Sequence, residues 1–175
     1  SPITLDVDPT NRCNQDCVWC SFEYLHRKRS MLGEEIFLKL ATDLSEFKNN
    51  NGRVVRSMIF TGGGEPTLNP ILPKIMQICN NSSIRCGIYT NGTFRSPHLR
   101  EVILHSCDFI RFSIEASNKD LYDRLHKPRT KGAYKQVIEN IREIATLKRR
   151  TGAGPDIGIS FLVHPFNWKD IIQSA

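Results

Sequence analysis

The sequence has no apolar run long enough to cross a membrane, and its opening residues lack the basic start and apolar centre of a secretory signal peptide. We therefore expect a cytoplasmic protein with no membrane partner. No internal repeat or low-complexity segment interrupts the chain either. Of its 175 residues 39% are hydrophobic, so the chain can bury one good-sized core, and a single domain is expected.

A disulfide framework is not expected, although the chain has six cysteines. Such frameworks belong to short secreted chains that lack a hydrophobic core. Three of the cysteines, Cys13, Cys17 and Cys20, are crowded into the stretch RCNQDCVWC, and the other three are dispersed. In a reducing compartment clustered thiols more often hold a metal or a cluster, whereas isolated ones are usually inert core residues.

An aromatic-rich RNA-binding signature is also missing, although the net charge is +6. Basic residues gather at 26–29 and 148–150. Runs of this kind are usually solvated faces or helix ends, because cations are favourable near a helix C-terminus. The charge therefore permits a nucleic-acid partner without indicating one.

What the sequence does contain is a strand pattern followed by a helix pattern, five times over. Strands are expected at 3–8, 54–60, 84–88, 109–114 and 157–163, and helices at 36–47, 72–79, 97–105, just after 117 and at 134–145. The cluster at 49–52 is expected to stop the first helix. Ser96 predicts a helix cap, and Ser117 with Asp120 resembles a capping box.

Repeated strand-helix units predict an α/β fold with a parallel sheet and right-handed crossovers. A complete eight-unit barrel needs about 250 residues, so we expect a partial (β/α) TIM-like barrel of about five to six units. Residues 1–175 are then one core domain. We expect it to be a fragment of a longer chain, lacking the last strand and any C-terminal substrate or auxiliary-cluster domain.

The unusual motifs all follow the expected strands, where the reactive groups of α/β barrels collect. In chain order they are RCNQDCVWC, TGGGEP, TNGT, IEAS and HPFN. Motifs that are far apart in the sequence are therefore expected to converge around one mouth. On the fourth strand Ser113 and Glu115 share a face with Arg111, because successive side chains of a strand alternate.

The cysteine spacing C-x-x-x-C-x-x-C allows one loop to fold its thiolates around an inorganic centre. A structural zinc site normally has four protein ligands, and the nearest fourth candidate, His26, lies in a basic run. Iron–sulfur clusters are held by cysteine thiolates, and a cubane with three protein ligands leaves one iron open. Three ligands without a fourth therefore indicate an open, working site.

This loop resembles the cluster motif of the radical S-adenosylmethionine (radical SAM) superfamily, in which an aromatic residue precedes the last cysteine. Trp19 occupies that position, PTNRCN precedes the cluster as in the family, and GGGEP at the end of the second strand matches the family's GGE element. The resemblance covers essentially the whole chain. It implies that Cys13, Cys17 and Cys20 bind a 4Fe–4S cluster.

The resemblance also assigns residues to SAM. The cofactor-binding residues that it implies are Trp19, Gly62, Gly63, Gly64, Glu65, Asn91, Ser113, Glu115 and Val163. Glu65 is expected to accept from the ammonium group of SAM, and Val163 to contact adenine. Many relatives bind the SAM carboxylate through an arginine after the fourth strand. Here that stretch reads YDRLHKPR, so Arg124, His126 and Arg129 are all candidates.

By resemblance the expected activity is reductive cleavage of SAM to a 5′-deoxyadenosyl radical, which abstracts hydrogen from a substrate. A small metabolite such as a sugar, nucleoside or natural-product intermediate is the first expectation, and a flavodoxin or ferredoxin type of protein is the expected electron donor. An RNA- or peptide-modifying enzyme of the same superfamily and a zinc-stabilised binding module are the alternatives. No residue can be assigned to the chemistry on the substrate.

Overall fold

The computed structural model describes residues 3–22, 28–47 and 55–174. Within these residues five parallel strands form one sheet in the order β1-β2-β3-β4-β5. The strands are β1 Thr4–Val7, β2 Ser57–Phe60, β3 Arg85–Thr90, β4 Cys107–Ser113 and β5 Asp156–Ser160. The helices are α1 Glu34–Glu46, α2 Leu72–Asn81, α3 Pro97–Ser106, α4 Lys119–His126, α5 Ala133–Thr151 and α6 Ile171–Ser174, with short 3₁₀ turns η2 at Pro66–Leu68 and η3 at Trp168–Asp170.

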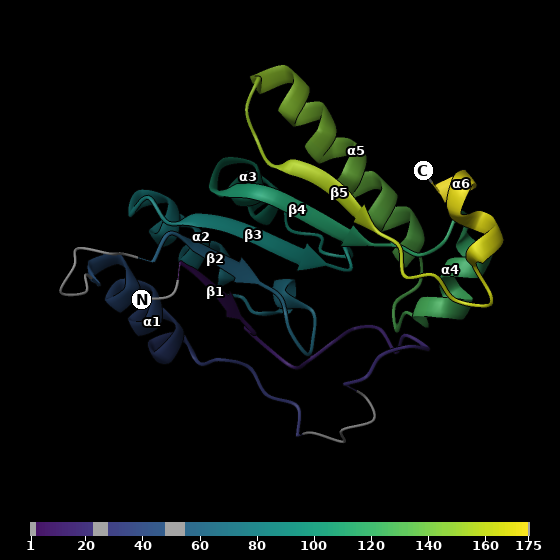
Figure 1. Ribbon diagram of the computed structural model, residues 1–175, viewed down its shortest axis with the longest axis horizontal. Helices are drawn as coiled ribbons and strands as arrows, with labels where there is room; N and C mark the ends of the chain where they lie inside the picture. The colour runs from purple at the N-terminus through teal and green to yellow at the C-terminus, as the bar shows by residue number, and fades with distance from the viewer. Residues whose placement is uncertain (1–2, 23–27, 48–54, 175) are drawn as a thin grey trace.

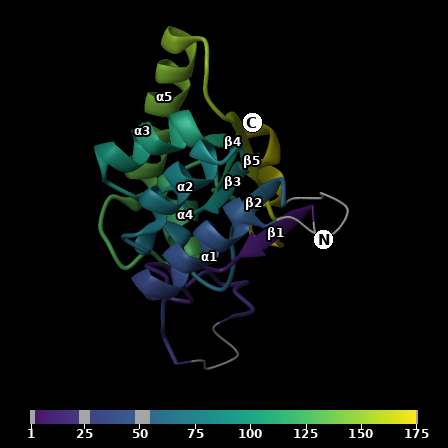
Figure 2. The same ribbon diagram turned by 90° about the vertical axis from the view of Figure 1, so that its left-hand side faces the viewer.

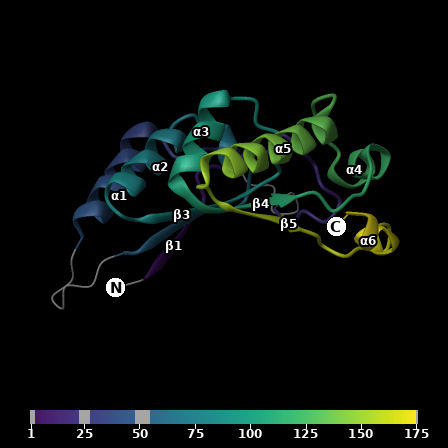
Figure 3. The same ribbon diagram turned by 90° about the horizontal axis from the view of Figure 1, so that it is seen from above.

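The sheet is wound in one direction, since each new strand pairs with the strand before it. Helices α1, α2, α3 and α5 lie together on one side of it (Figures 1 and 3), and the view of Figure 2 separates the helical layer from the strands. The expected partial (β/α) barrel is therefore confirmed. Its other face is the inner face of the barrel and points away from α1, α2, α3 and α5 (Figures 2 and 3).

The core lies between the sheet and the helices because alternate strand residues are apolar. On β4, Ile110 and Phe112 are fully buried, whereas Arg111 is exposed and Ser113 half-buried on the opposite face. The predicted division of this strand into two faces is confirmed. The main buried side chains of the core are Phe37, Met58, Phe60, Ile75, Ile88, Ile103, Ile110, Phe112, Val137 and Ile144. The dispersed cysteines Cys79, Cys86 and Cys107 are buried in the same core, as expected.

Two predicted helix boundaries can be compared with the structure. Ser96 caps α3, and its side chain accepts a hydrogen bond from the Leu99 N–H at 3.2 Å, as predicted. The prediction of a capping box at Ser117 is wrong. Asn118 caps α4 instead, and its side chain accepts a hydrogen bond from the Leu121 N–H at 3.0 Å. Ser117 instead donates to Asp170 at 2.6 Å, so its hydroxyl is used for a contact with the C-terminal segment.

The fifth strand ends at Ser160, three residues earlier than predicted. Its partner β4 ends at Ser113, which pairs with Ser160, so no neighbouring strand continues the ladder. The chain then turns, and the buried Asn167 side chain donates to the Leu162 carbonyl at 2.9 Å and to the Glu115 carbonyl at 3.0 Å. Large apolar side chains on this edge are exposed, namely Ile159, Leu162, Val163, Phe166, Trp168, Ile171 and Ile172.

The basic run 148–150 lies in the last turn of α5, and Gly152, in the left-handed conformation, caps the end of the helix. The interpretation of this run as a helix end is confirmed. The helix-stopping cluster 49–52 and His26 lie outside the described residues. In the described part of the chain, no helix combines the length and the hydropathy that a membrane span requires.

Candidate active site

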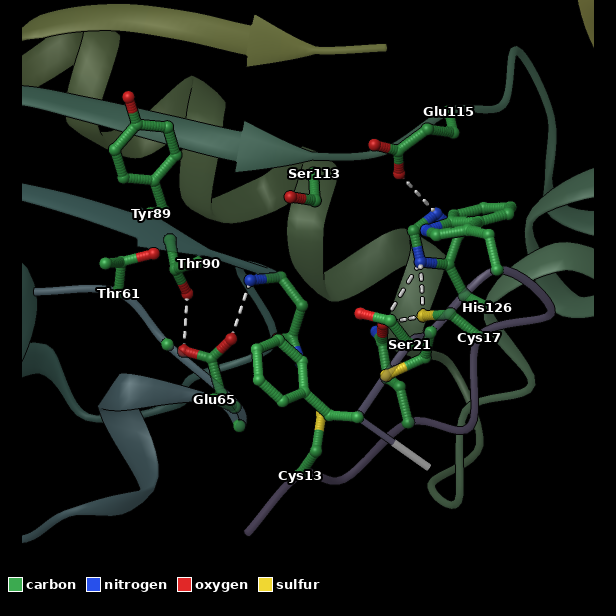
Figure 4. A pocket seen from close by; sticks show the side chains of 17 residues that line it. Cys13, Cys17, Ser21, Thr61, Glu65, Tyr89, Thr90, Ser113, Glu115 and His126 are labelled. Atoms are coloured by element: carbon green, nitrogen blue, oxygen red, sulfur yellow. Dashed lines mark hydrogen bonds and ion pairs between the residues drawn. The ribbon is translucent and has the colours of Figure 1, made fainter. Parts of the chain in front are cut away.

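A cavity of about 340 Å³ lies at the carboxyl ends of the strands (Figure 4). The loops that follow β1, β2, β3 and β4 all contribute to its wall, so the predicted convergence holds for four of the five motifs. HPFN, after β5, does not line it. Ten of the twelve predicted site residues line the cavity: Cys13, Cys17, Trp19, Cys20, Gly62, Gly64, Glu65, Asn91, Ser113 and Glu115.

The cysteine loop is docked on the end of α4. The Val18 N–H donates to the Leu125 carbonyl at 2.9 Å, and the Asp16 N–H donates to the His126 carbonyl at 3.1 Å. The Asp16 carboxylate accepts from the Arg129 guanidinium at 2.9 Å. A turn inside the loop is closed by the Cys20 N–H, which donates to the Cys17 carbonyl. These contacts hold all three cysteines, each half-buried, along one wall of the cavity.

The surroundings of Cys13 and Cys17 favour the protonated thiols in the metal-free protein. Burial raises the pKa of the Cys13 thiol to about 11, and burial together with the neighbouring Cys13 and Glu115 also raises the pKa of Cys17. Thiolates rather than thiols bind metals, so loading this site must release protons. Within residues 3–22, 28–47 and 55–174, no three His, Cys, Asp or Glu side chains stand close enough together for one metal ion.

The glycine loop after β2 packs directly on the backbone of the cysteine loop. A Cβ on Gly64 would stand 2.3 Å from the Arg12 carbonyl oxygen, a distance that no side chain tolerates. The Glu65 N–H donates to the same carbonyl at 2.8 Å. Gly62 has φ +125°, a region that favours glycine, and Gly63 donates its N–H to the Asp8 carboxylate at 2.8 Å. Gly63 thus belongs to the loop but is not part of the cavity wall.

Glu65 is buried and ties the glycine loop to the end of β3. Its Oε1 accepts from the Thr90 hydroxyl at 2.6 Å and from both the hydroxyl and the N–H of Thr67. Its Oε2 accepts from the Asn91 N–H at 2.7 Å (Figure 4). Burial raises the pKa of this carboxyl, and the hydrogen bonds from Thr90, Thr67 and Asn91 oppose the rise. The expected contact of Glu65 with the SAM ammonium stays a prediction.

Asn91 and Glu115 extend the polar wall. The Asn91 amide donates to Asn14 Oδ1 at 2.7 Å, which joins the end of β3 to the cysteine loop. Glu115, with φ +50°, is 3% exposed, and its Oε2 lies 3.0 Å from His126 Nε2. Asn91 and Glu115 therefore reach the cavity from different strands and are each held by a partner from another element.

Of the three candidates after the fourth strand, only His126 lines the cavity. The Arg124 guanidinium lies 4.0 Å from the centre of the Phe166 ring, and Arg129 binds Asp16. Val163 lies beyond the end of β5, is 59% exposed and is not part of the wall. Its predicted contact with adenine stays a prediction.

The comparison with protein families decides what kind of site this is. The model of the radical SAM superfamily matches residues 7–175. The chain belongs to this superfamily. The enzymes of this superfamily use a 4Fe–4S cluster and SAM, and these are the cofactors of this chain.

Two curated relatives illustrate the range of proteins to which this chain is similar. A tungsten-containing aldehyde ferredoxin oxidoreductase cofactor-modifying protein of Pyrococcus furiosus is 25% identical over 98% of this chain and 46% of its own length. The S-adenosyl-L-methionine-dependent tRNA 4-demethylwyosine synthase of Xenopus laevis is 21% identical over 84% of this chain and 22% of its own length. The chain thus spans less than half of either relative.

Solved radical SAM structures have the same fold. Streptococcus suis SuiB bound to its precursor peptide SuiA superposes with a TM-score of 0.69, at 18% identity, over 98% of this chain and 35% of SuiB. SuiB has also been solved with S-adenosylmethionine bound, and that structure gives a TM-score of 0.67, at 17% identity, over 99% of this chain and 37% of SuiB. At these identities the likeness concerns the fold alone.

The described residues fit the radical SAM cofactors. Three thiols line one wall, which suits a cubane, in which each thiolate binds a different iron. The rest of the wall carries polar groups, and the cavity volume lies within the range of about 300–1,000 Å³ found for small-molecule sites.

Several wall residues of this radical SAM site were not predicted. They are Gln15, Ser21, Phe22, Thr61, Tyr89 and Thr90. Tyr89 follows the buried Ile88 on β3, so the alternation of that strand places Tyr89 on the inner face and was a usable signal. For Gln15, which hydrogen bonds to the buried Tyr122 hydroxyl, the sequence gives no local signal, because the two residues are 107 positions apart.

Proposed function

We propose that the chain is the catalytic core of a radical SAM enzyme of the cytoplasm. Bound together, a reduced 4Fe–4S cluster and SAM supply the cleavage of SAM to methionine and a 5′-deoxyadenosyl radical that abstracts hydrogen from a substrate. The observation that carries the proposal is the single cavity shared by three cysteine thiols and the polar ends of β2, β3 and β4. We further propose that residues 1–175 form a core domain within a longer protein.

In this proposal each part of the wall has a distinct task. Cys13, Cys17 and Cys20 would hold the 4Fe–4S cluster through their thiolates, with SAM bound beside it. The glycine loop brings backbone groups close to SAM, since glycine has no Cβ to keep a ligand away. Glu65 and Glu115 offer anionic acceptors in a buried setting, where hydrogen bonds to charged groups are strong.

Asn91, Ser113 and Trp19 complete the frame in the proposed site. The Asn91 side chain is fixed through Asn14, and Trp19 meets the His126 ring edge-on with ring centres 5.2 Å apart. These contacts order the wall before SAM arrives, which reduces the entropy lost on binding. A wall of this kind also excludes water from the place where a radical is generated.

The decisive experiment compares two cysteine variants under anaerobic conditions. The protein is reconstituted with iron and sulfide, reduced and given SAM, and 5′-deoxyadenosine is measured. Cys17→Ala is expected to lose the cluster and form none. Cys107→Ala, which removes a buried thiol far along the chain from the motif, is the control and is expected to keep both iron and activity. A fully loaded wild type that forms no 5′-deoxyadenosine refutes the proposal.

For the substrate we propose a small metabolite, and for the electron a donor protein of the flavodoxin or ferredoxin type. The modest volume of the cavity supports a small substrate, since SAM itself must fit into the same space. The RNA alternative makes a different prediction: binding of unmodified tRNA that weakens steeply as salt rises. A gel-shift titration of the reconstituted protein at two salt concentrations separates the two substrate classes.

A further inference from the structure

Arg111 is a cation on the inner face of the sheet, next to the active-site cavity. It is exposed on β4, two residues before Ser113 and on the same face of the strand. Ser113 lines the cavity, and so does Tyr89, which pairs with Arg111 in the ladder of β3 and β4. Figure 4 shows Tyr89 and Ser113 on the side of the cavity away from Cys17. A molecule in the cavity can therefore reach Arg111 by extending roughly 6–7 Å along β4 from Ser113.

The Arg111 guanidinium is held over an aromatic ring. Its Cζ lies 5.8 Å from the centre of the Tyr89 ring, within the range of a cation–π contact. The Tyr89 ring in turn meets Phe109 nearly edge-on, with ring centres 5.6 Å apart. Phe109 lies over Gly87, where any Cβ would clash with its ring. These contacts position the guanidinium without using its N–H groups.

The side-chain N–H groups of Arg111 have no acceptor among the residues that the structure describes. By contrast, Arg85, Arg100 and Arg129 each bind a carboxylate. Asp156 shares the inner face with Arg111, but its carboxylate is bound by Lys148 at 3.0 Å. The five N–H donors of Arg111 are therefore open to a ligand.

The neighbouring strand leaves one edge of this guanidinium uncovered. Gly158 on β5 pairs with Arg111, and a Cβ there would lie 3.5 Å from Nε and 4.0 Å from Nη2. Through two such nitrogens an arginine binds an oxyanion with two parallel hydrogen bonds. Glycine has no side chain to occupy that place. The space beside Arg111 thus suits a carboxylate or a phosphate group.

We propose that Arg111 binds a carboxylate or phosphate group of the substrate, over the Tyr89 ring and beside Gly158. The inference rests on the proposed function and restricts its substrate to an anionic small molecule. The anionic end of the substrate is held at Arg111, and the part that reacts extends past Ser113 into the cavity. A bidentate contact fixes the orientation of a ligand as well as its position, which the removal of one particular hydrogen requires.

The first experiment titrates the metal-free protein with inorganic phosphate and, separately, with acetate, and follows the isotope-labelled arginine side chains by nuclear magnetic resonance. The Nε–H signal of Arg111 is identified by its loss in Arg111→Gln. We expect this signal to move along a saturating curve, and the anion that saturates it at the lower concentration identifies the group. Arg85, which binds Asp108, is the internal control. An Arg111 signal that moves no more than that of Arg85 overturns the inference.

A variant at Gly158 tests the geometry while Arg111 stays in place. Gly158→Val fills the space beside Nε and Nη2 with a side chain that suits a strand, since 3.5 Å is an ordinary contact distance for a Cβ. Anion binding is expected to weaken by about tenfold, the effect of losing one hydrogen bond to a charged group. Thr4→Val, on the inner face of β1, is the matched control and is expected to bind like the wild type. Equal affinities of the two variants overturn the site.

The last experiment separates the substrate from SAM. Equilibrium dialysis of the reconstituted protein measures SAM binding with and without the anion at a saturating concentration. The two SAM affinities are expected to agree, because Arg111 lies outside the cavity wall. A SAM affinity that falls about tenfold in the presence of the anion assigns Arg111 to the SAM carboxylate and overturns the inference alone. A loaded wild type that forms no 5′-deoxyadenosine overturns the proposed function and the substrate assignment with it, whereas anion binding by the metal-free protein does not depend on that result.

Discussion

The Glu65 carboxylate accepts the backbone N–H of Asn91 at 2.7 Å, across the gap between the loop after β2 and the end of β3. Its other oxygen accepts from Thr90 and Thr67. One buried side chain therefore satisfies four donors from two elements of the site. An uncharged substitute of the same shape cannot do so, because an amide has only one acceptor atom.

Glu65→Gln is expected to lower the free energy of unfolding by about 1–3 kcal/mol, the usual effect of leaving a buried donor unpaired. Whichever way the amide is turned, its NH₂ group faces a donor. Urea unfolding of the metal-free protein measures the change. Glu101→Gln, at an exposed position of α3, is the control and is expected to stay within about 0.5 kcal/mol of wild type. Equal stability of both variants contradicts the anchoring role of Glu65.

Gly64→Ala is expected to push the glycine loop off the cysteine loop. Its Cβ would stand 2.3 Å from the Arg12 carbonyl oxygen, and backbone cannot yield as a flexible side chain does. We expect a loss of about 1–3 kcal/mol in stability, as for other overpacked sites, and a reduced iron content after reconstitution. Gly33→Ala is the matched control, since a Cβ there meets nothing within 4 Å. A Gly64 variant that loads and unfolds like the control refutes the close packing.

The Asp16–Arg129 ion pair predicts a pH dependence of stability. Arg129 holds the pKa of Asp16 below its usual range through a hydrogen bond. Because the folded pKa is depressed, the stabilisation is present above the unfolded pKa of about 3.9 and is lost as pH falls through the folded pKa. With side chains 41% and 37% exposed, the pair is worth at most about 1 kcal/mol.

A double-mutant cycle of Asp16→Asn and Arg129→Gln, measured by urea unfolding at neutral pH and again below the folded pKa, checks this prediction. The coupling between the two changes is expected at neutral pH and should vanish in acid. Additive effects at both pH values mean that the pair contributes nothing to docking the cysteine loop on α4.

Removal of the cluster is expected to lower the melting temperature of the wild type. A group that binds only the folded protein stabilises it, and thiolate ligands are available in the required arrangement only when the cysteine loop is docked. Differential scanning calorimetry before and after treatment with a strong iron chelator measures the difference. Cys13→Ala is expected to melt at one temperature in both conditions. A wild type that is indifferent to the chelator contradicts a cluster held by folded protein.

The sequence predicts most of the fold because its signals are local. Alternation on β4 separates Phe112 from Ser113, and the Ser96 cap marks the start of α3. The predictions were wrong where a residue far away in the sequence determines how a helix or strand begins or ends. Ser117 is engaged by Asp170, so Asn118 caps α4 instead, and the fifth strand ends where its neighbour β4 runs out.

In the candidate site, too, local sequence signals predicted some residues, whereas contacts between distant residues determined others. The motif spacing predicted the three cysteines, and strand ends predicted Glu65 and Asn91 as wall residues. The choice among Arg124, His126 and Arg129 could not be made from the sequence. Which of the three side chains faces the cavity depends on how α4 and the residues after it pack against the cysteine loop, and the contact with the SAM carboxylate stays a prediction.

The contact between Cys17 and His126 joins residues that are 109 positions apart. A ribosome that adds about 5–20 residues per second needs roughly 5–20 s to make the intervening chain. During that interval the cysteine loop has emerged without the helix on which it docks. The thiols are then open to oxidants and to stray metal ions. The cysteine loop therefore reaches its docked position only after the chain has been synthesised beyond His126.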